Sequence, residues 1–577
     1  MYSKEADFCP LHETNMSNPS FNMVAPLRRE ESALRISGQM LSVSDVHSVA
    51  AGGRRVTLTS DPEVLARLQE AQNLVDEAVE NQWKVYGLTT GFGSMADQEV
   101  PSKLANASQE NLLSFLSCGA GSPVDVIHVR AAMLLRANML LHGASGVRIE
   151  LIERYLYFLN HGVTPVVKEL GSIGASGDLV PLATIARAIT GQAASCEVEM
   201  NGETIDRDDA LVEMGLPPLE LRPKEALAMI NGTTFSSAIA TNCVSSSRTY
   251  LGLSLVAHTM MIRALLGHED PFDPFVHECK PHPGQVWTAS TMRDLLGLNE
   301  TQNEKADIDE RTHLQDRYSL RCLPQYFGPL VEGILRVQRT VETEMNSVTD
   351  NPLIDVKAGR FLQSGNFLGQ YVGMAMDDLR RCLGLLAKHL DVQIAHLVAP
   401  EFNHGLPASL VGNPASPINM GLKGLQITGN SIMPMLTYLG NPHVEHFPTH
   451  AEQYNQNVNG LSWGSANLAS QSVDLYANYI SIALIFGVQG SDLRCFDTHR
   501  HYDGRSLLSP AVARIYELVY EAAGREPGRD RPLLFDDQDF PLEGLLEKLK
   551  EGLSDGGALS QAVEPLLESL DEIEFAL

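Results

Sequence analysis

The sequence predicts a mainly α-helical protein with a long central helix bundle and a smaller N-terminal domain. Apolar residues recur at helical spacing through most of its 577 residues. Four of these periodic runs are long enough to form the helices of a bundle, and breaks rich in Pro and Gly separate them. Hydrophobic residues make up 44% of the chain, which is ample for a large core.

The chain divides into four expected parts. Residues 1–32 are polar and unpatterned, which predicts a flexible N-terminal tail. We expect an N-terminal domain over residues 33–235 and the central long-helix bundle over 236–523. Residues 524–577 complete the chain as a C-terminal helical segment.

The N-terminal domain is expected to combine helices with short β elements. The β-branched residues of 38–56, with a turn at Gly52-Gly53, predict a small hairpin. Asp61-Pro62 begins a helix, because Pro is well tolerated in the first helical turn. Asn201-Gly202, at the centre of 197–205, predicts a second hairpin. Further helices are expected at 108–116, 126–141, 148–159 and 183–190.

The later half of the sequence is dominated by long helical patterns. The expected bundle helices are residues 236–266, 326–345, 368–398 and 465–488. The C-terminal segment opens with turns rich in Pro, Gly and Arg, and it ends in one or two acidic amphipathic helices within 542–570.

Composition excludes several classes of function. The formal net charge of −28 argues against nucleic acid or an anionic membrane as a partner. The apolar run at 251–266 is interrupted by His258 and Arg263, so no membrane span is expected. Eight cysteines are scattered without a CxxC pair and no HExxH motif occurs, so we expect neither disulfides nor a metal site. The N-terminus lacks the apolar core of a secretory signal, which favours a cytoplasmic location.

One short segment, Gly171 to Leu182, has three glycines in seven residues. An ordinary tight turn is the simple interpretation. A chemical interpretation is also open, because in a tight enough turn the nitrogen of Gly177 reaches the carbonyl carbon of Ala175. Ring closure with loss of two waters, one from the Ser176 hydroxyl, would leave a five-membered ring with an exocyclic methylidene. That group is an electrophile, which no ordinary side chain supplies.

The same tripeptide also occurs earlier, as Ala144-Ser145-Gly146. Gly143 before it is typical of a helix end, and Ser145 is suited to cap the helical pattern that follows. We therefore interpret the first copy as a turn between two helices, and the second copy as the candidate for chemistry.

Four polar clusters interrupt the apolar pattern, and each also fits an ordinary packing or solvated position. Tyr86 lies in a glycine-rich loop, and as a base it would need a pKa below its usual value of about 10. Asn231 places an amide at the end of a helical pattern. Residues 315–321 bring together two Arg, a Tyr and a Gln, and an Arg fork matches a carboxylate. Glu452 and Gln456 are four residues apart, so on a helix they would share a face.

These motifs, in this order, resemble the aromatic amino acid ammonia-lyases, a superfamily of histidine, phenylalanine and tyrosine ammonia-lyases and related aminomutases. The similarity runs from about residue 35 to about 510 and includes the motifs at 86–93, 174–179, 231–233, 315–321 and 365–367. It implies a mostly helical homotetramer in which each active site draws on three subunits. It also implies that Ala175, Ser176 and Gly177 cyclise to a 4-methylidene-imidazol-5-one (MIO) group, with no metal and no diffusible cofactor.

The resemblance further implies a role for each motif residue. Tyr86 would take the β-proton of the substrate, Arg321 would hold its carboxylate, and Tyr318 would lie beside the reacting carbons. The groups expected to hold the carboxylate or the MIO oxygen are Asn231, Gln315 and Asn366. The further pocket positions are Phe115, Leu116, Lys423, Glu452, Asn455 and Gln456.

The ring pocket is where the resemblance bears on the substrate. Phe115 and Leu116 offer only apolar surface, and a substrate hydroxyl buried there without a partner would cost about 1–3 kcal/mol. This favours L-phenylalanine over tyrosine, with trans-cinnamate and ammonia as products, as in bacterial members of the phenylalanine branch. Three alternatives stay open: an MIO-dependent phenylalanine 2,3-aminomutase, a lyase that also accepts tyrosine, and an inactive helical scaffold. The intact motif residues argue against the scaffold.

Overall fold

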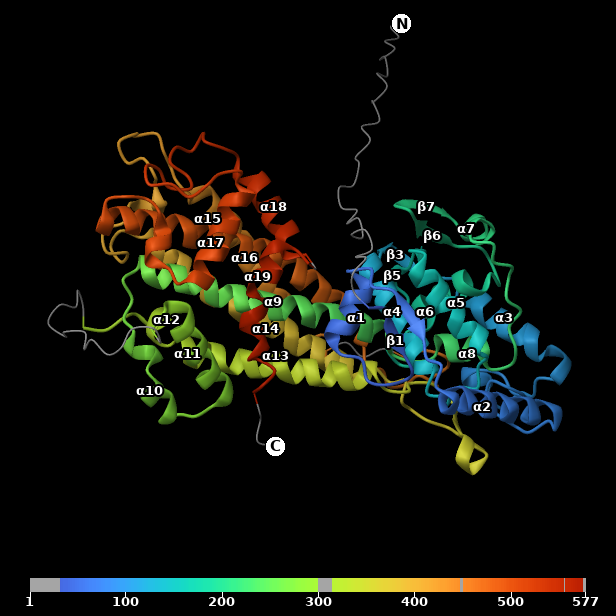
Figure 1. Ribbon diagram of the computed structural model, residues 1–577. Helices are drawn as coiled ribbons and strands as arrows, with labels where there is room; N and C mark the ends of the chain where they lie inside the picture. The colour runs from blue at the N-terminus through green and yellow to red at the C-terminus, as the bar shows by residue number, and fades with distance from the viewer. Residues whose placement is uncertain (1–31, 299–313, 447–449, 555, 574–577) are drawn as a thin grey trace, which may run out of the picture.

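A computed structural model describes residues 32–298, 314–446, 450–554 and 556–573. The predicted N-terminal tail therefore lies outside the described residues, apart from Ser32. The described chain is mainly helical, as predicted, and a small lobe lies at one end of a long helix bundle (Figure 1).

Four long helices form the bundle and confirm the periodic pattern of the sequence. They are α9 (Thr234–Ala264), α13 (Leu323–Met345), α14 (Gln370–Val398) and α16 (Ser462–His499). Residues of α9 and α16 are buried on nearly every side, because α13, α14 and further helices surround them. The last helix is longer than predicted, since the pattern ended at residue 488 and the helix continues to His499. A shorter helix, α15 (Lys423–Leu439), packs against α14 and α16.

The N-terminal lobe carries eight described helices before the bundle begins. They are α1 (Val43–Ala50), α2 (Pro62–Glu80), α3 (Ala105–Phe115), α4 (Val126–Leu140), α5 (Ile149–Asn160), α6 (Leu179–Thr190), α7 (Arg207–Glu213) and α8 (Glu225–Ile230). The predicted helix starting at Pro62 is confirmed, and the carboxylate of Asp61 accepts a hydrogen bond from the Glu63 N–H as its N-cap.

One predicted hairpin is confirmed and the other is wrong. Strands β6 (Glu197–Met200) and β7 (Glu203–Asp206) are antiparallel, and Asn201 and Gly202 adopt the left-handed conformation that the turn requires. In contrast, β1 (Leu34–Ile36) pairs in parallel with β2 (Val56–Leu58), and α1 fills the connection. Of the segment 38–56, only Val56 is in a strand. Val43, Val46 and Val49 recur at helical spacing and bury one face of α1, so they were a signal for helix rather than for strand.

The remaining strands are short. β4 (Thr164–Pro165) joins β6, β3 (Ala120–Pro123) pairs with β5 (Lys168–Leu170), and β8 (Leu353–Asp355) pairs with β9 (Arg360–Leu362).

The first Ala-Ser-Gly copy is a turn between α4 and α5, as predicted, but Ser145 does not cap the helix. The N-cap of α5 is Arg148, and the buried hydroxyl of Ser145 has no hydrogen-bond partner among the described residues. Gly143 and Gly146 both have positive φ, and the helix begins at Ile149, four residues after Ser145.

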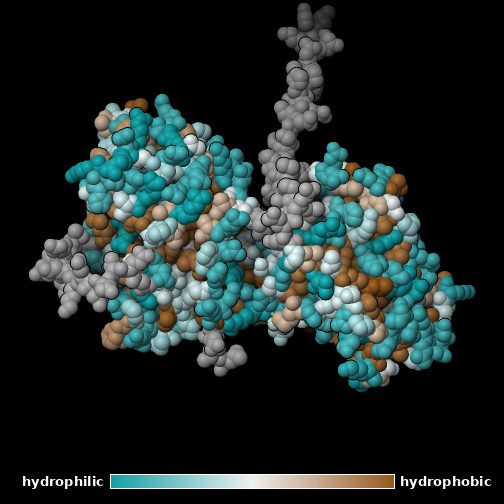
Figure 2. Space-filling view, viewed as in Figure 1, coloured by the Kyte–Doolittle hydropathy of each residue, from teal (hydrophilic) through white to brown (hydrophobic). Residues whose placement is uncertain are grey.

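The far end of the bundle carries α10 (Pro274–Glu278), α11 (Pro283–Leu296) and α12 (Tyr318–Arg321) (Figure 1). The C-terminal segment forms α17 (Pro510–Ala522), α18 (Leu542–Leu553) and α19 (Ala558–Glu568), so the predicted acidic pattern resolves into two helices. In the described ranges, no helix has the length and apolar character to span a membrane. The face in Figure 2 is mostly hydrophilic, and hydrophobic residues interrupt it on both lobes.

A buried ion pair fixes the small lobe to the bundle. The Lys224 Nζ atom lies 2.5 Å from an Asp350 carboxylate oxygen, and both side chains are fully buried. Lys224 precedes α8, and Asp350 follows α13. Because an isolated charge in this position would be costly, the pair holds the segment that follows α13 beside the start of α8.

Candidate active site

The glycine-rich segment is a tight loop that leads into α6. Gly174 and Gly177 both adopt the left-handed conformation, with φ of 64° and 71°. A Cβ atom on Gly177 would overlap the main chain of Gly232, and the Asp178 N–H donates to the Gly232 carbonyl at 2.9 Å. The loop therefore lies directly against the segment that joins α8 to α9.

Two side-chain amides donate hydrogen bonds to Ser176. The Nδ2 of Asn231 lies 2.9 Å from the Ser176 carbonyl oxygen, and the Nε2 of Gln456 lies 3.1 Å from the Ser176 hydroxyl. The neighbouring Ser172 hydroxyl donates to the Gly177 carbonyl at 3.1 Å. Two residues that lie 55 and 280 positions after Ser176 in the sequence thus meet at this serine.

A buried carboxylate supports the loop from behind. Asp178 accepts hydrogen bonds from the Ser236 N–H at 2.7 Å and from the Ser172 hydroxyl at 3.2 Å. Burial raises the pKa of Asp178 to about 6, although these hydrogen bonds oppose the shift. The carboxylate ties the loop to the first turn of α9.

The Tyr86 loop lies against the segment that contains Glu452. The hydroxyl oxygen of Tyr86 accepts a hydrogen bond from the Gly93 N–H at 2.9 Å, and the Glu452 carboxylate packs directly on Gly93. Ser94 donates to the Gln453 side chain at 2.5 Å. Burial raises the pKa of Tyr86, and the charge of Glu452 raises it further, whereas the Gly93 hydrogen bond acts in the opposite direction.

The segment that carries Glu452, Asn455 and Gln456 is not a helix, so the predicted shared helical face is wrong. Glu452, Gln453 and Tyr454 have φ of 51°, 48° and 67°, three consecutive residues in the left-handed region. This conformation is unfavourable for residues with a Cβ. It reverses the chain, so that Ala451 pairs with Gln456 and Asn455 Nδ2 lies 3.3 Å from a Glu452 oxygen.

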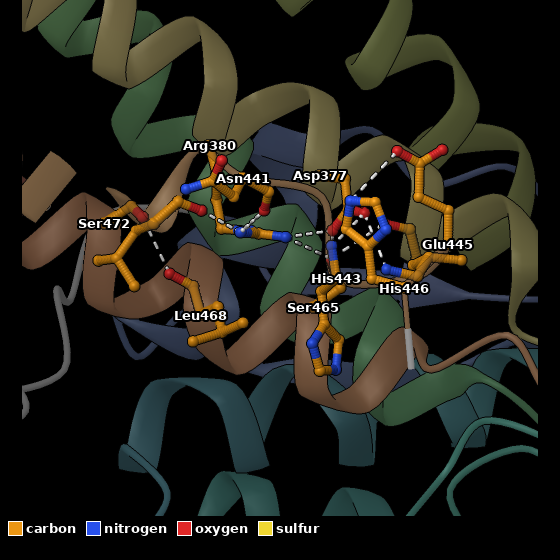
Figure 3. A network of polar contacts seen from close by, with 12 residues as sticks. Asp377, Arg380, Asn441, His443, Glu445, His446, Ser465, Leu468 and Ser472 are labelled. Carbon is orange, nitrogen blue, oxygen red and sulfur yellow. Dashed lines mark hydrogen bonds and ion pairs between the residues drawn. The ribbon is translucent and has the colours of Figure 1, made fainter. Parts of the chain in front are cut away.

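A polar network holds the preceding residues to α14 and α16 (Figure 3). One Asp377 oxygen accepts the N–H groups of His443 and Val444, at 2.8 and 3.0 Å. The other accepts the Ser465 hydroxyl at 2.6 Å and also contacts Arg380. Arg380 in turn donates to main-chain carbonyls at the end of α15. The network fixes the start of the segment that leads to Glu452.

The predicted pocket residues Asn366, Phe115 and Leu116 also lie in this half of the molecule. Asn366 is exposed, and its side-chain amide donates to the Val348 carbonyl at 3.2 Å. Three residues later, the Gly369 N–H donates to the Gly174 carbonyl, so this loop contacts the glycine-rich segment. Leu116 is buried in the core, whereas 55% of Phe115 is exposed at the end of α3.

Four predicted site residues lie at the opposite end of the bundle. Arg321 and Tyr318 form α12, and the Arg321 guanidinium stacks on the Tyr318 ring at 4.6 Å from its centre. The helix α13 begins two residues after Arg321 and ends beside Thr233, whose hydroxyl donates to Glu344 at 2.6 Å. A helix of 23 residues is about 35 Å long, so α12 is far from Ser176 (Figure 1). The other two distant residues are Gln315, next to α12, and Lys423, at the far end of α15.

The sequence reasoning missed two residues that support the site. Asp377 and Arg136 contact site segments only through main-chain groups, and no motif marks them. The available signal was the type of residue, because a charged side chain interrupts an apolar helix pattern at each position.

Comparisons with known proteins agree with this fold. The model of the aromatic amino acid lyase family matches residues 41–521. A phenylalanine ammonia-lyase from Nostoc punctiforme is 48% identical over 94% of this chain and 96% of its own. An aromatic ammonia-lyase from Loktanella atrilutea is 41% identical over 93% and 99%. The crystal structure of a tyrosine aminomutase from Streptomyces globisporus superposes with a TM-score of 0.81 at 27% identity, covering 92% of this chain and 99% of the other.

The fold and the loop at Ser176 define a helical enzyme of the ammonia-lyase type. The chain belongs to the aromatic amino acid lyase family. Its named ammonia-lyase relatives are carbon–nitrogen lyases.

The approach of Gly177 to Gly232 generates a prediction about stability. Gly177→Ala should destabilise the protein strongly, because the new methyl group meets the Gly232 main chain and φ is positive. Gly202→Ala is the matched control, since Gly202 is also left-handed but a Cβ added there would have no neighbour within 4 Å. We expect the control to cost about 1–2 kcal/mol and Gly177→Ala about 1–3 kcal/mol more. Apparent melting temperatures at one scan rate measure the difference, and equal losses would contradict the expected overlap.

Proposed function

We propose that this protein is a phenylalanine ammonia-lyase, which converts L-phenylalanine to trans-cinnamate and ammonia. The observation that carries the proposal is the pair of amides, from Asn231 and Gln456, that converge on Ser176. The 48% identity to a phenylalanine ammonia-lyase supports the same reaction, because the aminomutase structure is less similar, at 27%. A cytoplasmic location is part of the proposal.

We infer that Ala175, Ser176 and Gly177 form the MIO group. Gly177 N would bond to the Ala175 carbonyl carbon, and two waters would leave, one with that carbonyl oxygen and one with the Ser176 hydroxyl. The left-handed conformation of Gly177 and the hydrogen bond from Asn231 to the Ser176 carbonyl support this fit. The group would supply an electrophile that captures the substrate and makes its amine a better leaving group.

The chain's own residues would do the remaining work. Tyr86 would take the β-proton, because its hydroxyl oxygen already accepts the Gly93 N–H, which stabilises a phenolate. Asn231 would hold the MIO oxygen, the former Ser176 carbonyl. Leu116 and Phe115 would surround the substrate ring and leave a phenol hydroxyl without a partner.

We infer that the complete active site needs more than one copy of the chain. Arg321, expected at the substrate carboxylate, and Lys423, expected as a further pocket residue, lie at the opposite end of the bundle from Tyr86. A homotetramer with shared sites would bring the two ends together. Exposed apolar residues on α15, Ile427, Met435 and Tyr438, support such a contact. Cations from neighbouring copies would also offset the raised pKa of Tyr86.

The basic experiment uses the two Ala-Ser-Gly copies. The purified protein should release cinnamate from L-phenylalanine, seen as near-ultraviolet absorbance, and its mass should be lower by two waters. Ser176→Ala should lose the mass deficit and nearly all turnover. Ser145→Ala is the matched control and should keep both, because the Ser145 hydroxyl has no described partner. β-Phenylalanine as the main product would favour the aminomutase, and full activity in Ser176→Ala would reject the mechanism.

Shared sites predict complementation between inactive variants. Tyr86→Phe and Arg321→Ala should each be nearly inactive alone. When the two variants are co-expressed, about a quarter of the sites should combine an intact Tyr86 with an intact Arg321 from another copy. Turnover by the purified mixed assembly tests this. If both residues came from one copy, the mixture would stay as inactive as its components.

The position of Glu452 predicts a change in pH dependence. If Tyr86 acts as the base, kcat/KM should rise with pH as its hydroxyl loses a proton. Burial and the Glu452 charge raise the pKa of Tyr86, so Glu452→Gln should lower that pKa and move the acid limb to lower pH. Glu203→Gln, at an exposed position in the β6–β7 hairpin, is the control and should leave the limb in place. A limb that stays or moves to higher pH would contradict the assignment.

A further inference from the structure

A buried arginine lies directly behind Asn231. Arg136 belongs to α4 and is fully buried. Its Nη1 atom donates to the main-chain carbonyls of Asn231, at 2.9 Å, and of Ala228, at 3.2 Å. Both carbonyls belong to the C-terminal end of α8, where the helix dipole is negative and a cation is favourable.

Most of this guanidinium lacks a partner. The Nε and Nη2 atoms form no hydrogen bond to any described residue, and the described carboxylates form no ion pair with Arg136. The nearby Asp350 is paired with Lys224 instead. A buried charge without close pairing is unfavourable for folding, so simple packing does not explain why a guanidinium occupies this position.

Arg136 and the Ser176 loop bind two different groups of the same residue, Asn231. Asn231 gives its main-chain carbonyl to Arg136 and its side-chain amide to the Ser176 carbonyl. Fixing the main chain of Asn231 limits the directions in which its amide can point. In a buried site, a positive charge close to a hydrogen-bond donor also strengthens the positive potential at the acceptor.

We propose that Arg136 is a positioning residue of the active site, which directs the Asn231 amide at the Ser176 carbonyl and adds positive potential there. The inference rests on the proposed function, in which this carbonyl becomes the MIO oxygen. Arg136 acts through Asn231 and does not touch the substrate.

The chain offers a matched control on the same helix. Arg130 is also buried in α4, and it donates to the carbonyls of Val49 and Ala50 at the end of α1, at 3.1 and 3.0 Å. It therefore shares the burial, the helix and the type of contact of Arg136, but it has no link to Asn231. Substitution of either arginine should affect stability, and only Arg136 should affect the site.

The experiment compares Arg136→Gln and Arg136→Lys with Arg130→Gln and Arg130→Lys in the full chain. Intact mass reports whether the MIO group has formed. The difference in near-ultraviolet absorbance between each protein and its Ser176→Ala counterpart reports how strongly the carbonyl is polarised. Arg136→Gln should lower kcat about 10- to 100-fold with little change in KM, and it should shift the MIO band to shorter wavelength. Arg136→Lys, which keeps the charge, should show smaller changes in both.

The outcomes separate the two proposals. A wild-type chain without the mass deficit would overturn the proposed function, independently of Arg136. With the deficit present, a folded Arg136→Gln protein with wild-type kcat and an unshifted band would overturn the positioning role. Arg130→Gln with an equal loss of kcat and an equal band shift would do so too. Failure of both Arg136 variants to fold, with both Arg130 variants soluble, would make Arg136 purely structural and would also overturn it.

Discussion

The contact of the Gly177 main chain with the Gly232 main chain is the constraint on which the site depends. This contact leaves no space for a side chain on Gly177. The main chain of the loop before α6 therefore packs directly against the main chain that joins α8 to α9. Asn231, one residue before Gly232, can therefore reach the Ser176 carbonyl, and Asp178, one residue after Gly177, can reach the first turn of α9. Arg136 binds the C-terminal end of α8 at this junction, and the Lys224–Asp350 pair holds the start of the same helix.

Much of the fold could be predicted because helical periodicity is a local property. The four bundle helices and the Asn201-Gly202 hairpin follow from residue spacing and turn chemistry alone. The hairpin expected at 38–56 was wrong, because the helical spacing of Val43, Val46 and Val49 outweighs their strand propensity and forms α1. The helical face expected for Glu452 and Gln456 was also wrong. Tertiary contacts there impose a left-handed turn on residues that do not favour it.

The identity of the site residues was easier to predict than their arrangement. Motifs identified Tyr86, Ser176, Asn231 and Arg321, and the first three lie in one half of the molecule. Nothing in the motifs indicates that Arg321 lies a full helix length away, since sequence order carries no information on distance. In the proposed assembly, the stability of the oligomer and the activity of the enzyme are thereby linked, because a separated chain holds only part of each site.

The helix α13 has a role beyond packing, because it sets the spacing between the two ends of the molecule. A one-residue insertion in it would move α12 by about 1.5 Å and rotate it by about 100° relative to the Ser176 loop. In a symmetric assembly that error would appear in every shared site at once. We therefore expect natural members of this family to vary freely in surface loops but to keep the number of residues in this helix constant during evolution.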